Sequence, residues 1–437
     1  MNPTWASDGG PRVVVNQAGY LPGWPKVALI VDGVSPTKVK VIDVRTERSV
    51  LELDPSESVT DSLSNDAVRT VDFSSVNVPG RYKLAYGSVE SFPFDISPNA
   101  YEAATRLILR GFFLQRCGIK LNDARSGLTH EICHVHDATL RHSDEVNSAG
   151  TAWSAPGGWH DAGDYGKYVS TTAVAAGQLL SLYLHHRAVV QWDNLGIPES
   201  GNGIPDILDE VRVGVDWMVK MQRQDGAVYR KLSGTKWPHN MTPDADRQPR
   251  FVYGISTPDT AKFVAVLALA SRIFQPFDAE LAARYLKHAE DGWRFLEKHP
   301  AQIFEYKDGD DSGSGPYRAT DTDIEAALTF DWDDRVWAAS ELYLTTRGAP
   351  YAKAFVAYAR YMPYTLFEWK DPSSLGLLHF LLDATAPDLD GLRGKIRDRL
   401  IARAQAQVAK VKLSQYRVAN RRVVWGSNKM TVQEGLT

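Results

Sequence analysis

The pattern of apolar residues along this chain changes at Ser97-Pro98. Before that point, short runs rich in β-branched residues alternate with turn residues, at 13–15, 26–31, 39–44 and 82–86. Evenly spaced short strands of this kind are typical of a small β-sandwich. After that point, apolar residues recur at helical spacing. The sequence therefore predicts a β-sandwich over residues 11–96, followed by a helical domain over residues 97–437.

The helical segments are joined by long loops, with no strand-like runs between them. Such a chain favours an all-α toroid or bundle. Helical periodicity predicts helices at 101–115, 171–187, 206–222, 258–275, 278–297, 334–346, 351–361 and 388–411.

The net charge and the hydropathy of the chain argue against two kinds of partner, nucleic acids and membranes. A net charge of -4 gives no electrostatic footprint for nucleic acid. No run of 18 apolar residues occurs, so we expect no membrane-spanning helix. Residues 1–10 lack the basic start and apolar stretch of a signal peptide. Two expectations stay open: a cytoplasmic protein, or a mature secreted or periplasmic chain with an added Met.

Residues 157–165, which read Gly-Gly-Trp-His-Asp-Ala-Gly-Asp-Tyr, place two carboxylates three positions apart. Small residues let a loop bend and let a substrate approach closely. Asp161 and Asp164 could hold one water between them, and close like charges raise one pKa, as a general base requires. A solvated turn or a helix N-cap explains the Asp-Ala-Gly-Asp tetrapeptide when it is taken alone.

Further motifs follow this loop in a fixed order, at 201–210, 215–222, 225–226, 254–261, 337–343 and 424–428. Together with residues 157–169, this series resembles the signature of glycoside hydrolase family 9, the inverting cellulases. Residues 15–22 resemble the opening of the immunoglobulin-like domain that precedes many catalytic domains of that family. The resemblance covers nearly the whole chain. A domain of this kind could bind carbohydrate, but bracing of the catalytic domain is favoured, because no row of exposed aromatic residues is readable in the sequence.

The resemblance also implies a particular helical fold, an (α/α)6 barrel whose loops build an open groove at one end. Such a barrel needs about twelve helices, whereas periodicity predicts roughly eight or nine. We therefore expect the barrel to be truncated at its C-terminal end, without the Glu that serves as catalytic acid in the family. Glu434 follows the match at 424–428 too closely to be that Glu.

The implied reaction is hydrolysis of β-1,4-glucosidic bonds in cellulose, cellodextrins or related glucans, with inversion. A base activates water on one face of the sugar, while an acid on the other face protonates the leaving oxygen. By resemblance, Asp164 is the base and Asp161 helps to hold the water. The substrate is the expected partner, and no redox or organic cofactor is needed.

The chain has two cysteines, Cys117 and Cys133, which could form a disulfide or stay as buried thiols. However, His134 follows Cys133 directly, and His160 lies beside the Asp-Ala-Gly-Asp loop. Two thiolates and two imidazoles make a closed tetrahedral zinc set, and some family members carry a structural zinc here. We expect these four residues to bind zinc. If one of these four residues is not a ligand, His130 or His136 is the expected replacement.

Residues 308–334 are acidic and glycine-rich, and clustered carboxylates suit calcium. Asp333 and Asp334 occupy the place where family members often carry an Asp-Glu calcium pair. Asp383 could complete the site. A solvated acidic loop is the alternative.

Aromatic side chains bury well against sugar rings, and this chain has 12 Trp and 18 Tyr. Trp237 and His239 fall where the family lines its groove, and Arg250 also matches a family position. Tyr317 and Trp332 are further candidates, although an aromatic residue in a long loop often packs beneath that loop.

Two other functions stay open. A chain without the general acid could be a catalytically inactive carbohydrate-binding protein. An exo-acting glycosidase on amino-sugar oligosaccharides is the second alternative, since the family has such members. A helical scaffold without a ligand would not explain the Asp-Ala-Gly-Asp loop.

Overall fold

The computed structural model describes residues 10–31, 37–310, 328, 330–362, 370–419 and 432. They form two compact units, each with its own hydrophobic core. The first comprises Met1–Ile108 with Ala404–Val423, and the second comprises Leu109–Arg403 with Val424–Thr437. Among the described helices, none combines the length and the apolar character needed to cross a membrane.

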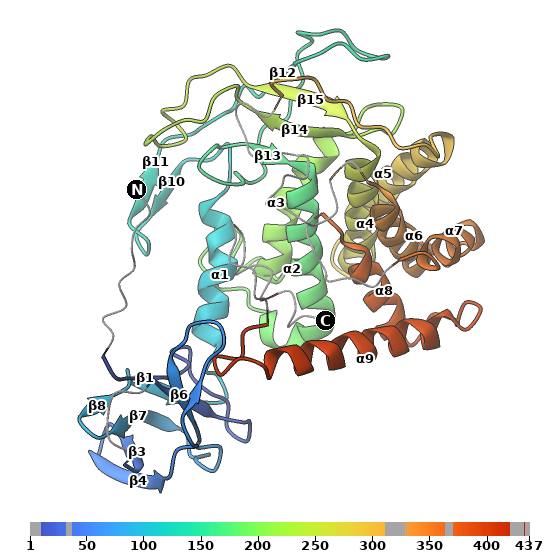
Figure 1. The fold of residues 1–437 in the computed structure, drawn as a ribbon. Helices are drawn as coiled ribbons and strands as arrows, with labels where there is room; N and C mark the ends of the chain where they lie inside the picture. Colours follow the sequence, from blue (N-terminus) through green and yellow to red (C-terminus); the bar gives the residue numbers. More distant parts are fainter. Residues whose placement is uncertain are drawn as a thin grey trace. The chain divides into compact units, whose positions relative to one another are not determined.

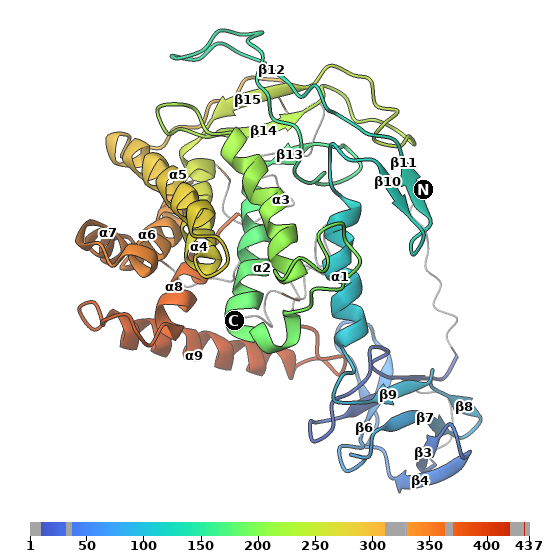
Figure 2. The same ribbon diagram turned by 180° about the vertical axis from the view of Figure 1, so that it is seen from behind.

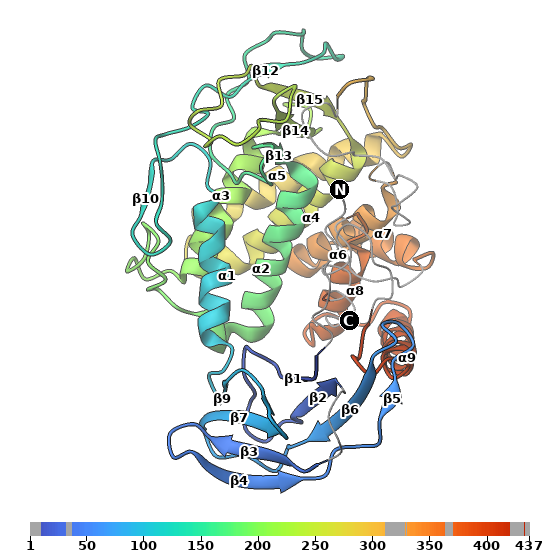
Figure 3. The same ribbon diagram turned by 60° about the vertical axis from the view of Figure 1, so that its left-hand side comes forward.

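The first unit contains two antiparallel sheets that stack as two layers (Figure 3). One sheet has the order β1 (Arg12–Val14), β2 (Val27–Val31), β6 (Ala67–Asp72), β5 (Val59–Thr60). The other has the order β4 (Arg48–Leu53), β3 (Val39–Asp43), β7 (Gly80–Tyr86), β8 (Val89–Glu90), and β9 (Phe94–Ile96) pairs with β7. Alternate residues of β7 are buried, as expected for a strand with one face on the core. The predicted β-sandwich is confirmed.

A late segment of the chain belongs to the same unit as these sheets. Asp61 accepts hydrogen bonds from the Ser414 hydroxyl at 2.8 Å and the Gln415 amide at 2.7 Å. The Tyr416 hydroxyl donates to Asp66 at 2.6 Å. Burial alone would raise the pKa of Asp61, but these and other hydrogen bonds lower it to about 2.

Helices α2 to α8 build the second unit, while α1 (Glu102–Leu114) and α9 (Leu392–Val411) contribute residues to both units. The helices of the second unit are α2 (Val169–Val190), α3 (Asp206–Lys220), α4 (Thr257–Phe274), α5 (Ala279–Lys298), α6 (Trp332–Thr346), α7 (Ala349–Ala359) and α8 (Ser373–Leu382). Every residue of α4 except Arg272 is buried, and α4 packs against α2, α5 and α6. A helix that is buried all round is the centre of its core.

The prediction that no strands separate the helices is wrong. A hairpin of β10 (Leu121–Asp123) and β11 (Leu128–His130) precedes a four-stranded sheet in the order β12 (Thr139–Leu140), β15 (Phe251–Ile255), β14 (Tyr229–Ser233), β13 (Lys167–Tyr168). That sheet covers the ends of α2 and α3 (Figures 1 and 2). The chain passes directly from β13 into α2 and from β15 through one residue into α4. The helix starts of α2 and α4 therefore lie at this sheet, beside the loop that carries Asp161 and Asp164.

Candidate active site and metal centre

The loop at residues 157–165 is closed by its own backbone. The Asp161 amide donates to the Gly166 carbonyl at 2.8 Å, and the Tyr165 amide donates to Ala162 at 3.1 Å. At Gly158, a Cβ atom would lie 2.6 Å from the Trp217 ring, so only glycine fits there. The loop therefore packs against Trp217 of the helical core, and its turn carries Asp161 and Asp164.

Asp164 is held firmly, with only 2% of its surface exposed. The Tyr168 hydroxyl donates to one carboxylate oxygen, and the Gly166 amide donates to the other at 3.2 Å. A Cβ atom at Gly166 would come within 2.6 Å of the Tyr168 ring and 2.7 Å of the Asp164 carboxylate. Donors on both oxygens fix the orientation of this carboxylate, and each oxygen keeps a second lone pair.

Asp161, by contrast, reaches the surface. The Thr171 hydroxyl donates to it at 2.6 Å. The pKa of Asp161 is raised, mainly because the surrounding protein removes water from its carboxylate. The Thr171 hydrogen bond lowers this pKa, and the negative charge of Asp164 raises it further. The structure thus brings the two predicted carboxylates close enough to interact electrostatically.

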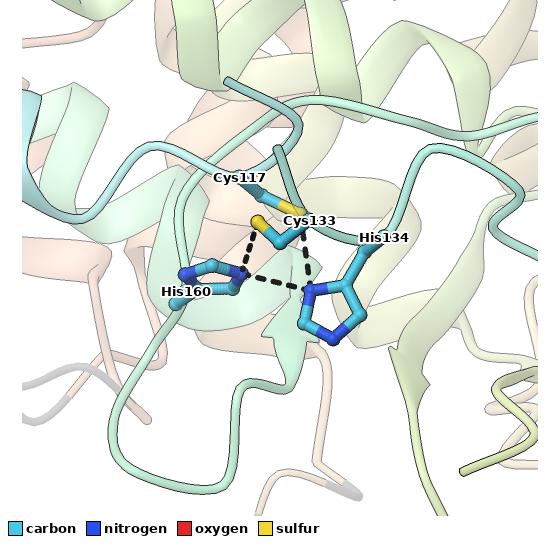
Figure 4. A group of neighbouring side chains, drawn as sticks. All are labelled: Cys117, Cys133, His134 and His160. Carbon is cyan, nitrogen blue, oxygen red and sulfur yellow. Dashed lines mark hydrogen bonds between the residues drawn. The ribbon is translucent and has the colours of Figure 1, made fainter. Parts of the chain in front are cut away.

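The predicted metal ligands Cys117, Cys133, His134 and His160 converge (Figure 4). Their four donor atoms lie within 4.8 Å of one another, and both cysteines are free thiols rather than a disulfide. The Cys117 and Cys133 sulfurs each lie 3.8 Å from a histidine nitrogen, and the two nitrogens lie 3.2 Å apart. Tetrahedral zinc, with bonds of about 2.3 Å to sulfur and 2.0–2.1 Å to nitrogen, would separate sulfur from nitrogen by about 3.6 Å and the nitrogens by about 3.3 Å. The donor set fits zinc in chemistry and in size.

The charge states of Cys117 and His160 suit a cation, whereas Cys133 holds a proton that a metal would have to displace. The hydrogen bond with Cys133 holds the pKa of Cys117 well below its usual range, although burial opposes this. The same hydrogen bond and burial raise the pKa of Cys133. Burial lowers the pKa of His160, which favours the neutral imidazole that binds metals. Neither substitute is needed: His136 is exposed, and His130 contacts the Glu131 carbonyl.

The predicted groove residues divide into three groups. Trp237 is 42% exposed, and its ring lies over Gly163, where an added Cβ would be 3.9 Å away. His239 is exposed on the same segment. Trp332 is half exposed and packs its ring against Tyr358 and Tyr361. Tyr317 lies outside the described residues.

Arg250, also predicted as a substrate-binding residue, is buried, with a side chain only 4% exposed. It donates to Asp137 at 2.8 Å and to the Tyr165 carbonyl at 2.8 Å. Lys167 pairs with the other oxygen of Asp137 at 2.9 Å. Arg250 therefore holds the backbone of the loop through the Tyr165 carbonyl.

The predicted calcium residues are brought together only in part. Asp333 and Asp334 are both buried in the first turn of α6, where Lys262 pairs with Asp334 at 2.5 Å. Neither oxygen of Asp333 has a hydrogen-bond partner among the described residues. Burial raises the pKa of Asp334 to about 8 despite Lys262, and burial with the charges of Asp334 and Asp371 raises the pKa of Asp333.

Asp383 does not join this site, so that prediction is wrong. It pairs at 2.9 Å with Arg347, the residue that follows the C-terminal end of α6. Thirteen residues of helix separate Arg347 from Asp334, which corresponds to about 20 Å. Asp310, in the acidic segment, is already neutralised by Arg230 at 2.9 Å and contacts His142 at 2.7 Å.

Comparison with known proteins links this geometry to a family. Residues 101–436 match glycosyl hydrolase family 9, and residues 8–91 match the cellulase N-terminal ig-like domain. Endoglucanase D of Acetivibrio thermocellus is 32% identical over 432 residues, which cover 97% of this chain and 66% of the relative. A second endoglucanase D sequence is covered to 64%, so this chain spans about two thirds of the length of these relatives.

Solved structures agree with the sequence matches. The crystal structure of a metagenome-derived glycoside hydrolase family 9 endoglucanase superposes with a TM-score of 0.89 and 38% identity, over 98% of this chain and 78% of that chain. A Zn-binding triple mutant of the family 9 endoglucanase J30 superposes with a TM-score of 0.87 and 33% identity, over 95% of this chain and 77% of that chain.

Proposed function

This chain belongs to glycosyl hydrolase family 9, and we propose that it hydrolyses β-1,4-glucosidic bonds in cellulose, cellodextrins or related β-glucans with inversion of configuration. The observation that carries the proposal is the pair Asp161 and Asp164, which interact electrostatically on one pinned loop. The names of the relatives, endoglucanase D among them, support the same substrate class.

Within this proposal, Asp164 is the general base. Its carboxylate is oriented by Tyr168 and Gly166, and a free lone pair can accept a proton from water. Asp161, which is exposed and held by Thr171, positions that water. As water attacks the anomeric carbon, Asp164 takes its proton and the glycosidic bond breaks. The leaving oxygen is protonated by an acid on the opposite face of the sugar, roughly 6.5–9.5 Å from the base.

We propose that the segment around Trp237, which lies beside the loop at residues 157–165, binds the substrate. The Tyr165 hydroxyl donates to the Met241 carbonyl, which holds this segment against the loop. Trp237 therefore offers an exposed ring next to Gly163, on which a pyranose could stack. We propose that His239 contacts the same sugar, and that Trp332 is a more distant subsite.

The family matches suggest the domain organisation, although the first compact unit runs to Ile108 and includes Ala404–Val423. We propose an immunoglobulin-like domain over 11–96 and a catalytic domain over 97–437, whose helices belong to an (α/α)6 barrel. The boundary lies between the end of β9 at Ile96 and the start of α1 at Glu102. The family matches at 8–91 and 101–436 support this division.

We propose that Cys117, Cys133, His134 and His160 hold a structural zinc ion. Four protein ligands close a zinc site and leave no position for a substrate, so the ion would supply rigidity rather than catalysis. The ring of Tyr165 packs edge-on against His160, with ring centroids 5.2 Å apart. The cluster would thereby keep the loop that bears Asp164 in place.

Calcium is the second metal that we propose, with Asp371 in place of Asp383. The supporting observation is Asp333, whose two buried oxygens have no hydrogen-bond partner among the described residues. Lys262 supplies one positive charge beside Asp333 and Asp334. The charge of Asp371 acts on Asp333, so a cation there would relieve repulsion among three carboxylates.

The test is release of reducing ends from carboxymethylcellulose and cellopentaose, with wild type and Asp164→Ala side by side. We expect release that is lost in the variant. Binding of cellopentaose without release would replace the proposal with a carbohydrate-binding protein. Release from chitosan oligosaccharides alone would replace it with an exo-acting glycosidase.

A further inference from the structure

The ring of His134 has a second nitrogen that the metal cluster does not use. Its Nδ1 atom faces Cys117 and His160 (Figure 4). Its Nε2 atom is buried and has no hydrogen-bond partner within the described part of the chain. It lies 3.6 Å from the Oδ2 atom of Asp246, and the two side chains are only 4% and 3% exposed. An imidazole nitrogen and a carboxylate thus face each other away from water.

This arrangement has a direct consequence for metal binding. A neutral histidine that binds a metal through Nδ1 carries its proton on Nε2. Ligand histidines usually donate that proton to a carboxylate or a carbonyl, which fixes the tautomer and the ring orientation. A shift of about 0.7 Å would bring His134 and Asp246 to an ordinary hydrogen-bond distance.

Asp246 is in turn tied to the segment that carries Trp237. Gln248 donates its backbone amide to Oδ1 of Asp246 at 3.2 Å and its side-chain amide to Oδ2 at 3.1 Å. The side-chain oxygen of Gln248 accepts from the amides of Thr235 and Lys236, both at 3.0 Å. One carboxamide therefore joins the two ends of the segment at residues 235–248.

The backbone around this carboxamide leaves it no freedom. A Cβ atom at Gly234 would lie 2.1–2.6 Å from the side-chain atoms of Gln248, so a larger residue would displace them. Trp237 follows Lys236 directly and lies over Gly163. An interaction that holds Asp246 in place therefore also holds, through Gln248, the backbone at Thr235 and Lys236. That backbone leads directly into Trp237, whose ring lies on the loop at residues 157–165.

We propose that Asp246 is a positioning residue for the metal centre: it accepts the Nε2 hydrogen of His134 when the metal is bound. Through Gln248, it also couples metal occupancy to the order of residues 235–248. The inference rests on the proposed zinc site and adds a residue from a different segment of the chain to it.

The experiment compares the full chain with Asp246→Ala, Asp246→Asn and the control Met241→Ala. Met241 lies in the same segment, and its side chain is exposed. Zinc affinity is measured by competition with a chromophoric chelator. Order of the segment is measured by mass spectrometry of tryptic cleavage after Lys236 and Arg247, both exposed, with and without EDTA.

We expect Asp246→Ala to weaken zinc affinity by about 10–100-fold. Asp246→Asn should keep part of the affinity, because its side-chain oxygen still accepts a hydrogen bond, and Met241→Ala should match wild type. Zinc-loaded Asp246→Ala should be cleaved as fast as EDTA-treated wild type. With cobalt in place of zinc, the thiolate absorption bands should persist in Asp246→Ala, because Asp246 is not itself a ligand.

Equal zinc affinity in wild type and Asp246→Ala would overturn the proposal, and unchanged cleavage would overturn the coupling to residues 235–248. If Asp246→Ala does not fold, Asp246→Asn carries the same test. Absence of zinc binding by wild type would overturn the metal site together with this inference. Failure of the hydrolase proposal is distinguishable, since it would abolish product from cellopentaose while zinc affinity still depended on Asp246.

Discussion

Two pairs of aspartates lie at the starts of two helices, and their surroundings are opposite. Asp161 and Asp164 precede α2 and receive hydrogen bonds from Thr171, Tyr168 and Gly166. Asp333 and Asp334, in the first turn of α6, are buried beside Lys262. Hydrogen-bond donors orient the first pair toward a bound water, whereas burial opposes ionisation of the second pair and raises its pKa values.

The comparison shows that spacing alone does not reveal the role of paired carboxylates. Both pairs consist of Asp residues close in sequence. The first meets the surface through Asp161 and lies beside an exposed tryptophan. Both side chains of the second pair are covered. We therefore expect changes in the first pair to alter rate, and changes around the second pair to alter stability.

The largest effect should come from Asp164→Asn. Removal of the general base should lower kcat by about 10²–10⁴-fold, because a proton acceptor in the transition state is worth that much. The melting temperature should change little by comparison. Steady-state kinetics on cellopentaose, with circular dichroism as the folding control, measure both. An Asp164→Asn variant with the kcat of wild type would remove Asp164 from the mechanism.

The next largest effect should come from removal of Lys262, the cation beside Asp333 and Asp334. Above about pH 8, where Asp334 is ionised, Lys262→Met should lower the free energy of unfolding by about 3–5 kcal/mol, since it leaves a buried carboxylate without its partner. The double variant Lys262→Met/Asp334→Asn should recover part of that loss. Chemical denaturation of the three proteins provides the comparison, and an undisturbed Lys262→Met protein would show that the pair contributes no stability.

The second pair should also give the protein a distinctive response to pH. Burial raises the pKa of Asp334 from 3.8 to about 8, so the folded protein holds this proton more tightly than the unfolded chain. The free energy of unfolding contributed by Asp334 is therefore fully present below about pH 4 and is lost as pH rises through about 8. In calcium-free buffer with EDTA, wild type should lose more stability than Asp334→Asn between those values, measured by denaturation at a series of pH values. Parallel curves for the two proteins would contradict the raised pKa.

The smallest effect should come from the groove. Trp237→Ala should raise KM by about threefold to tenfold with a smaller change in kcat, because one stacked ring contributes about 1 kcal/mol. Trp24→Ala is the matched control, since Trp24 is 65% exposed on the β-sandwich. An equal rise in KM for both variants would mean that the sandwich binds carbohydrate as well.

The sequence predicts the parts of this molecule that depend on short-range patterns. The eight predicted helical segments correspond to observed helices, and the motif order leads to the right family. Helix α8 was not predicted, because its sequence Ser-Ser-Leu-Gly-Leu-Leu-His-Phe-Leu-Leu has no polar face. Strands β12 to β15 were not predicted because they are two to five residues long and pair segments far apart in the chain.

Within the site, the sequence predicted only the residues that lie in recognisable motifs. Asp161, Asp164 and the four metal ligands come together as expected. Arg250 matched a family position, but a match says nothing about burial, and the side chain is covered. Asp383 could not be excluded without the direction of α6. Asp246 lies 112 positions after His134 by number, in a loop without periodicity, so no sequence signal links the two.

The anomeric configuration of the first product tests the central claim most directly. Proton NMR during hydrolysis of cellopentaose, before mutarotation, should show the α-anomer at the newly formed reducing end, because water activated by Asp164 attacks from the face opposite the leaving group. Initial appearance of the β-anomer would mean retention through a covalent intermediate. That result would contradict the role of Asp164 as the base that activates water.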